Sequence, residues 1–137
     1  MSSAYFADTF FWIALANPRD AWHSRVAAWE NANRGAQFLT TEEVLAEVLN
    51  WFAGTGRIGR VLAVNVVRSV LADSSVNVLP QSTNDFASAL AFYEARLDKQ
   101  YSITDCRSMI VVKELGISEV LTNDHHFTQE GFTIMFH

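Results

Sequence analysis

The stretch that decides the fold is AYFADTFFWIALA, residues 4–16. Its first four residues are apolar and typical of a short buried strand, and Asp8 follows them directly. The apolar residues from Phe10 to Ala16 then indicate the beginning of a helix. We therefore predict a strand, a turn that carries a carboxylate, and a helix.

The same alternation continues to the end of the chain. Capping residues, glycines and apolar periodicity mark the element boundaries. The predicted strands are 37–39, 76–79, 120–122 and 132–136, and the predicted helices are 22–32, 40–53, 58–72, 82–97 and 104–115. Thr40, with Glu43 three residues later, and Thr104 are the expected N-caps of two of these helices. Alternating strands and helices predict an α/β fold with three layers, in which helices flank both faces of a central, mostly parallel sheet.

Length and composition favour one compact domain over residues 1–137, because half of the 137 residues are hydrophobic. No apolar run is long enough to span a bilayer, and the chain does not begin like a secretory signal. The single Cys106 cannot form an internal disulfide, so we expect a cytoplasmic protein without a membrane segment. The net charge of −5 gives no support to a nucleic-acid partner, although metal-bound carboxylates would leave a nearly neutral remainder.

Two carboxylates, Asp8 and Asp124, stand where predicted strands end. Ligands of open parallel sheets bind in the crevice beyond the carboxyl ends of the strands, so both side chains are expected to point into it. The alternative for each residue alone is a structural role as the cap of a turn or helix.

Glu47 and Asp105 lie on predicted helices. Val44, Val48 and Trp51 should face the core, and Glu47 lies beside them on the helix, where a carboxylate loses hydration and needs a cation or hydrogen-bond donors. Its alternative is a boundary position with the carboxylate in solvent. Asp105 is in a first helical turn, where the helix dipole alone favours a negative charge.

Together the four acids indicate a site for hard divalent cations. Mg²⁺ and Mn²⁺ choose oxygen ligands and retain several waters, so a few converging carboxylates suffice to hold them. Two such ions can activate a water and stabilise the leaving oxygen of a phosphodiester. We therefore predict nuclease chemistry that needs no nucleophilic side chain.

Four segments of the chain, taken in order and spacing, resemble the motifs of PIN domains, particularly those of VapC-like toxins of prokaryotic toxin–antitoxin pairs. These segments are ADT at 7–9, TEEVLAEVLN at 41–50, YSITDCRS at 101–108 and LTNDHHF at 121–127. The resemblance spans nearly the whole chain. It implies a Rossmann-like three-layer fold, a Mg²⁺- or Mn²⁺-dependent endoribonuclease acting on RNA, frequent homodimers, and a cognate antitoxin.

Position by position, the resemblance assigns the roles of individual residues. It makes Asp8, Glu47, Asp105 and Asp124 the catalytic and metal-binding quartet. Its supporting polar positions are Thr9, Thr104 and Ser108. The chain departs from the pattern at Phe10, where many members carry a small polar residue.

Other signals are weaker. Arg57 and Arg60 share one sector of a helix and are candidate RNA contacts, although a solvated face explains them as well. The pair His125 and His126 lacks a further His or Cys at ligand spacing, which favours a surface or supporting role over a transition-metal site.

Two alternative functions stay open at this level. The first is a receiver-like signalling domain that binds Mg²⁺ around a phosphorylatable Asp; against it, Asp8 has no adjacent acid and Lys113 falls inside a helix. The second is a catalytically silent PIN-like module that binds proteins.

Overall fold

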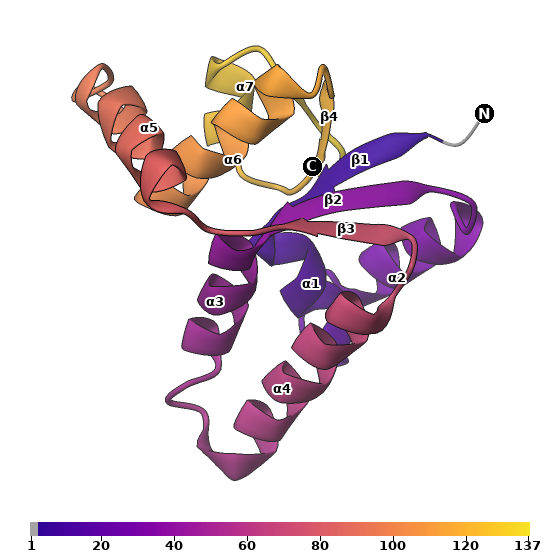
Figure 1. Ribbon diagram of the computed structural model, residues 1–137. Coiled ribbons are helices and arrows are strands. Elements are labelled where there is room, and N and C mark those ends of the chain that lie inside the picture. Colours follow the sequence, from indigo (N-terminus) through magenta and orange to yellow (C-terminus); the bar gives the residue numbers. More distant parts are fainter. Residues whose placement is uncertain (1–2) are drawn as a thin grey trace.

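The computed structural model describes residues 3–137 and contains five strands and seven helices. In chain order the elements are β1 Ala4–Ala7, α1 Thr9–Ala16, α2 His23–Ala32, β2 Gln37–Thr41, α3 Glu42–Trp51, α4 Gly56–Ala72, β3 Val76–Leu79, α5 Thr83–Glu94, α6 Ile103–Glu114, β4 Glu119–Leu121, α7 His126–Gln129 and β5 Thr133–Ile134 (Figure 1). All predicted elements are present, and α7 is an additional helix that the sequence pattern does not predict.

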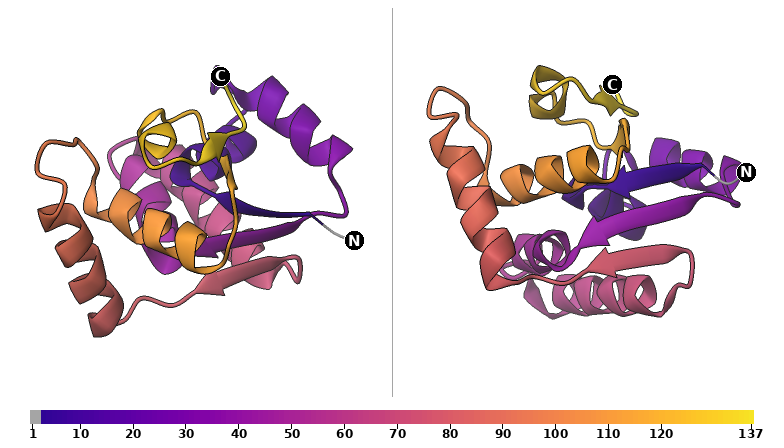
Figure 2. Two further views of the ribbon diagram at one scale, coloured as in Figure 1. Left: turned by 90° about the horizontal axis from the view of Figure 1, so that it is seen from above. Right: turned by 45° about the horizontal axis from the view of Figure 1, so that its top comes forward.

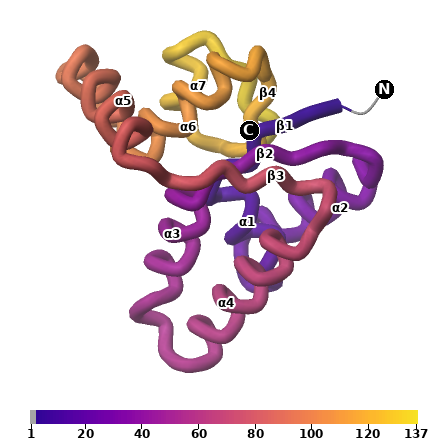
Figure 3. The backbone as a smooth tube through the Cα atoms, viewed as in Figure 1, coloured from indigo at the N-terminus to yellow at the C-terminus, as the bar shows by residue number. Residues whose placement is uncertain are grey.

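The five strands form one sheet with the order β3-β2-β1-β4-β5, and every neighbouring pair is parallel. The chain builds the sheet from β1 through β2 to β3, and then crosses back to place β4 on the other side of β1 (Figure 3). The strand order therefore reverses between β1 and β4. In open α/β sheets this reversal opens a crevice at the carboxyl ends of the two strands.

Helices cover both faces of the sheet, which confirms the predicted three layers. Helices α1 to α4 lie on one face, and α3 and α4 form a hairpin that extends away from the sheet (Figure 1). Helix α6 lies against the opposite face, with α5 packed on it (Figure 2). In residues 3–137 no helix is long and apolar enough to cross a membrane.

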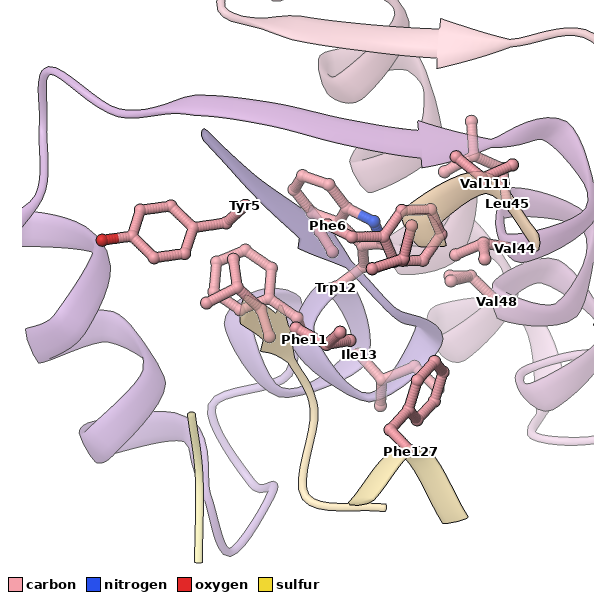
Figure 4. Packing of buried hydrophobic residues seen from close by; sticks show 14 of the residues in the cluster. Tyr5, Phe6, Phe11, Trp12, Ile13, Val44, Leu45, Val48, Val111 and Phe127 are labelled. Carbon is pink, nitrogen blue, oxygen red and sulfur yellow. The ribbon is translucent and has the colours of Figure 1, made fainter. Parts of the chain in front are cut away.

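The core forms between β1 and the helices on either side of it. Phe6 in β1, Phe11 in α1, Val44 in α3 and Phe127 in α7 are fully buried and pack into one cluster (Figure 4). Each such side chain contributes about 1.5–3 kcal/mol on leaving water. The strand β1 is buried on both sides, which is why its sequence is a continuous apolar run and does not alternate.

Two predicted N-caps are wrong by one or two residues. Strand β2 pairs with β3 as far as Thr41, so the cap of α3 is Thr41, whose hydroxyl accepts the Val44 N–H at 3.1 Å. Thr40 is instead buried in the sheet, where it donates to the Ala7 carbonyl at 2.9 Å. Helix α6 begins before Thr104, because Ser102 and Asp105 form a reciprocal capping box.

The prediction that Trp51 faces the core is also wrong. Val44 and Val48 are fully buried as expected, but Trp51 is 65% exposed at the end of α3. Trp51 is the last residue of α3, at the end of the helix that points away from the sheet, so it has no core to face (Figure 1).

A buried arginine joins the helices that carry the predicted site. Arg107 of α6 is only 6% exposed, and its Nε donates to Glu43 Oε2 of α3 at 3.0 Å. Its Nη2 lies 3.3 Å from Asp85 Oδ2 of α5. A buried guanidinium requires such partners. The ion pairs therefore fix the relative positions of α3, which carries Glu47, and α6, which carries Asp105.

Candidate metal centre

Asp8 is the most deeply buried member of the quartet. It follows β1 directly and caps α1, its side chain is only 5% exposed, and Thr122 Oγ1 donates to its Oδ2 at 2.9 Å. Burial raises the pKa of Asp8 to about 7, and the negative charges of Asp105 and Glu47 add to this effect. A carboxylate held in this way is stabilised by a cation in front of it.

Asp105 belongs to the first turn of α6 and also lines the acidic pocket. Its Oδ2 accepts the Ser102 N–H at 3.0 Å, and its own N–H donates to Ser102 Oγ at 3.0 Å, so it closes the capping box of α6. The same side chain also lines the acidic pocket. Burial, followed by the charges of Asp124 and Glu47, raises the pKa of Asp105 against the opposing hydrogen bond from Ser102.

Asp124 is held in a tight turn after β4. Its backbone N–H donates to Thr122 Oγ1 at 3.1 Å, and its Oδ1 accepts the His126 N–H at 2.9 Å. Thr122 therefore contacts both Asp8 and Asp124, which come from the two strands where the sheet order reverses. One hydroxyl fixes the spacing of two acids that are far apart in sequence.

Glu47 completes the group from the side of α3. It is half-buried and lines the same cavity as the three aspartates, a pocket of about 710 Å³. Phe10, Ile13 and Trp51 form the apolar part of the wall. All four acids predicted from the sequence therefore meet in one pocket.

The supporting residues are less uniformly placed. Thr9 lines the pocket, and Ser108 is fully buried in α6. Thr104 lies in a neighbouring hollow beside Arg107, outside the acidic pocket. Arg57 and Arg60 line a separate hollow on α4, so they do not contribute to the wall of the acidic pocket.

Sequence reasoning did not place several residues in the pocket, although it gave His126 a surface or supporting role. Asp20, Asn123 and Trp51 line the cavity, and His126 lies beside the carboxylates of Asp105 and Asp124. Asp20 belongs to the loop between α1 and α2, and no local pattern predicts where that loop packs. For His126 a usable signal exists, because a residue two positions after an Asp often closes an Asx turn.

The pocket fits a divalent cation. It gathers four carboxylates, and the pKa values of Asp8 and Asp105 are raised first by burial and then by the negative charges of the other acids. Two buried polar atoms at the pocket, Thr9 Oγ1 and His126 Nδ1, have no hydrogen-bond partner in the structure. Buried polar atoms are rarely left unpaired, and a hydrated cation supplies the missing partners.

The capping box of α6 gives a testable prediction. Ser102→Ala removes the hydroxyl that accepts the Asp105 N–H, and should lower the free energy of unfolding by about 1 kcal/mol. It should also weaken Mn²⁺ binding, because Asp105 loses one of the contacts that fix it. Ser82→Ala is the matched control, since Ser82 caps α5 and accepts the Asp85 N–H at 3.1 Å. We expect calorimetry to show the same loss of stability for both variants, and weaker Mn²⁺ binding for Ser102→Ala alone.

The fold and the pocket define a class of protein. The chain is a Rossmann-like α/β protein with an all-parallel sheet and an acidic pocket at the switch between β1 and β4. The family model of the PIN domain matches residues 5–132. The chain therefore belongs to the PIN-domain family, as the four sequence segments predicted.

Individual relatives agree with this assignment. The chain is 30% identical over 129 residues to the 23S rRNA-specific endonuclease VapC20 of Mycobacterium tuberculosis, and the match covers 93% of this chain and 94% of the relative. The crystal structure of M. tuberculosis VapC20, described as a sarcin–ricin loop cleaving toxin, superposes with a TM-score of 0.82 at 26% identity, covering 96% of this chain and 97% of that one.

Two more distant structures share the fold alone. FitAcB from Neisseria gonorrhoeae has a TM-score of 0.64 at 17% identity, covering 97% of this chain and 96% of that one. PAE2754 from Pyrobaculum aerophilum has the same TM-score and identity, covering 98% and 90%. The receiver-like alternative is not supported, because the chain belongs to another family and Lys113 lies 3.7 Å from Glu130 Oε1 and does not line the pocket.

Proposed function

We propose that the chain is a Mg²⁺- or Mn²⁺-dependent endoribonuclease and the toxin of a toxin–antitoxin pair. The observation that carries this proposal is the convergence of Asp8, Glu47, Asp105 and Asp124 in one pocket at the β1–β4 switch. These four residues would hold the cation. When bound, such an ion increases the acidity of water and stabilises the leaving oxygen of a phosphodiester.

The chain's own residues arrange the site before any ion or RNA arrives. Thr122 holds Asp8 and the Asp124 backbone, Ser102 holds Asp105, and the Arg107–Glu43 ion pair fixes the helices behind them. The four acids so arranged carry uncompensated negative charge, which repels a polyanionic RNA. Loading the pocket with cations removes the repulsion and is therefore coupled to substrate binding.

We propose a structured ribosomal RNA loop as the substrate class. The support is the relative's specificity for 23S rRNA, together with 30% identity over 93% of this chain. Single-stranded loops offer unstacked bases, which proteins bind on aromatic side chains. Trp51, which is 65% exposed, and Phe10, which is partly buried, both line the pocket and provide such surfaces.

The remaining parts of the proposal concern assembly and location. We propose one PIN domain over residues 1–137 that acts in the cytoplasm, forms a homodimer and is neutralised by a cognate antitoxin. Phe86, Leu90 and Tyr93 on α5 are each 44–51% exposed, and such apolar surface supports association with a partner chain. A small reading frame just upstream that encodes an antitoxin would support the toxin role.

The test is cleavage of purified ribosomes by the full-length protein. We expect discrete cuts in 23S rRNA that stop with EDTA and return with added Mg²⁺ or Mn²⁺. A mixed pool of other RNAs serves as the control for substrate class. Absence of any metal-dependent cleavage in both samples would favour the silent protein-binding module instead.

Trp51 gives a second prediction. Trp51→Ala removes a stacking surface without touching a carboxylate, so KM for RNA should rise about tenfold, in line with about 1–3 kcal/mol per stacked base. The rate at saturating RNA and the Mn²⁺ affinity should change little. Leu49→Ala, an exposed apolar position on the same helix that does not line the pocket, is the control. Steady-state kinetics on a short RNA loop measure both values.

A further inference from the structure

His126 brings an imidazole nitrogen to the acidic pocket. It is the first residue of α7, and its Nδ1 lies 3.1 Å from Asp124 Oδ1 and 3.8 Å from Asp105 Oδ2. The ring packs edge-on against Tyr101, with 5.6 Å between the ring centroids. Tyr101 is itself buried and donates its hydroxyl to Glu130 Oε2 at 2.9 Å. The imidazole is therefore held in place by the fold.

The close approach of His126 to Asp124 is not a hydrogen bond. Nδ1 is fully buried and has no hydrogen-bond partner in the structure, although an acceptor oxygen is only 3.1 Å away. At this distance a protonated imidazole would make an ion pair with Asp124, whereas a neutral one makes no hydrogen bond there. Asp124 Oδ1 accepts the backbone N–H of His126 itself at 2.9 Å. A buried nitrogen without a partner costs about 1–3 kcal/mol, so it is expected to serve another group.

The three side chains are close enough together to share one metal ion after small adjustments of their positions. One ligand atom from each of Asp105, Asp124 and His126 lies within 4.8 Å of the other two. Adjacent ligands of an octahedral ion with bonds of about 2.1 Å are separated by about 3.0 Å, and opposite ligands by about 4.2 Å. Thr9 Oγ1, which is buried in the wall of the same pocket and also lacks a partner, is a second indication that a ligand belongs there.

We propose that His126 Nδ1 is a nitrogen ligand of the ion that Asp105 and Asp124 hold, and that this end of the pocket therefore selects a first-row transition dication such as Mn²⁺ over Mg²⁺. The inference rests on the proposed function in one respect, namely that the acidic pocket binds a divalent cation. Mg²⁺ takes oxygen ligands, whereas first-row transition dications also bind imidazole, Mn²⁺ least strongly among them, so replacing one water or carboxylate by a nitrogen shifts the preference away from Mg²⁺.

Neighbouring His125 provides the matched control. It is exposed and lies outside the group of three ligand atoms, although it belongs to the same turn. His125→Ala therefore removes an imidazole from the same wall without removing the nitrogen between Asp105 and Asp124. The comparison isolates the ligand from the general effect of losing a histidine.

The test is calorimetric titration of the full-length protein with Mn²⁺ and with Mg²⁺. We expect His126→Ala to lose at least about tenfold in Mn²⁺ affinity and to change less than about threefold for Mg²⁺. His125→Ala should retain the wild-type preference for Mn²⁺. Equal losses for both metals, or no loss for either, would overturn the assignment of a nitrogen ligand.

A spectroscopic measurement on the unmutated protein decides the matter even where the variant does not fold. Pulsed EPR of bound Mn²⁺ should show coupling to a directly bound nitrogen, and this coupling should change when histidine is labelled with ¹⁵N. Mn²⁺-supported RNA cleavage without nitrogen coupling would refute the His126 ligand and leave the proposed nuclease intact. Failure of the wild-type protein to bind either metal would refute both.

Discussion

Asp105→Asn is expected to reduce metal-dependent RNA cleavage by about 10²–10³-fold, the order seen when one preorganised stabilising group is removed from an active site. The substitution keeps the size of the side chain and an oxygen that can accept the Ser102 N–H, so the capping box and α6 should persist. It removes one of the negative charges that face the pocket with Asp124 and Glu47. Single-turnover cleavage of 23S rRNA measures the loss, and circular dichroism checks the fold.

Asp98→Asn is the control for this experiment. Asp98 lies after α5 and makes an exposed ion pair with Lys99 at 3.4 Å, away from the pocket. Its cleavage rate should remain within about twofold of wild type, because exposed ion pairs contribute little. Wild-type activity in folded Asp105→Asn would remove this residue from the catalytic machinery.

Asp8→Asn is expected to stabilise the metal-free protein at alkaline pH. The pKa of Asp8 is raised from 3.8 to about 7 in the folded state, so folding favours its protonated form. The contribution of Asp8 to the free energy of unfolding is therefore most favourable below about pH 4, and it is lost as the pH rises through 7. A difference of about three pKa units corresponds to about 4 kcal/mol above pH 8. The amide carries no charge and avoids this penalty, apart from the cost of pairing its own N–H groups.

Urea unfolding in EDTA at pH 5 and at pH 8 measures this effect. At pH 8 the variant should be more stable than wild type by about 2–4 kcal/mol, and at pH 5 this advantage should be smaller by about 2–3 kcal/mol, because most of the charge on folded Asp8 appears between these two pH values. Saturating Mn²⁺ should reverse the order at pH 8, because ligand binding stabilises only the protein that retains the site. A wild-type stability that does not fall between pH 5 and 8 would contradict the burial of a charged Asp8.

Much of the fold could be predicted because local chemistry and tertiary structure agree. The run from Ala4 to Ala7 is apolar on both sides because β1 is covered on both faces, and Asp8 and Asp124 follow strands that lie side by side. Position at a strand end was enough to bring these two acids into one crevice. Glu47 followed from its place beside Val44 and Val48, which are fully buried.

The errors at helix starts have a local cause. Two capping residues stand close together in both cases, Thr40 before Thr41 and Ser102 before Thr104. Pairing of β2 with β3 extends to Thr41 and decides the first case. In the second, the Asp three residues after Ser102 completes a capping box, a spacing that was visible in the sequence.

Other features depend on contacts that no local pattern contains. Trp51 lines the pocket from the far end of α3, and Asp20 lines it from the loop between α1 and α2. The position of His126 requires the turn at Asp124 and the packing of Tyr101 together. Arg57 and Arg60 share a helix face as predicted, but the α3–α4 hairpin places that face in a different hollow from the acids.

The most direct test is a crystal structure of the protein soaked in Mn²⁺, with anomalous scattering used to locate the ion. We predict at least one Mn²⁺ in the acidic pocket, within about 2.5 Å of oxygens from two or more of the four carboxylates. Lattice contacts must leave the pocket open for the measurement to be valid. An open pocket that binds no Mn²⁺ at saturating concentration, or an ion bound only elsewhere, would contradict the account.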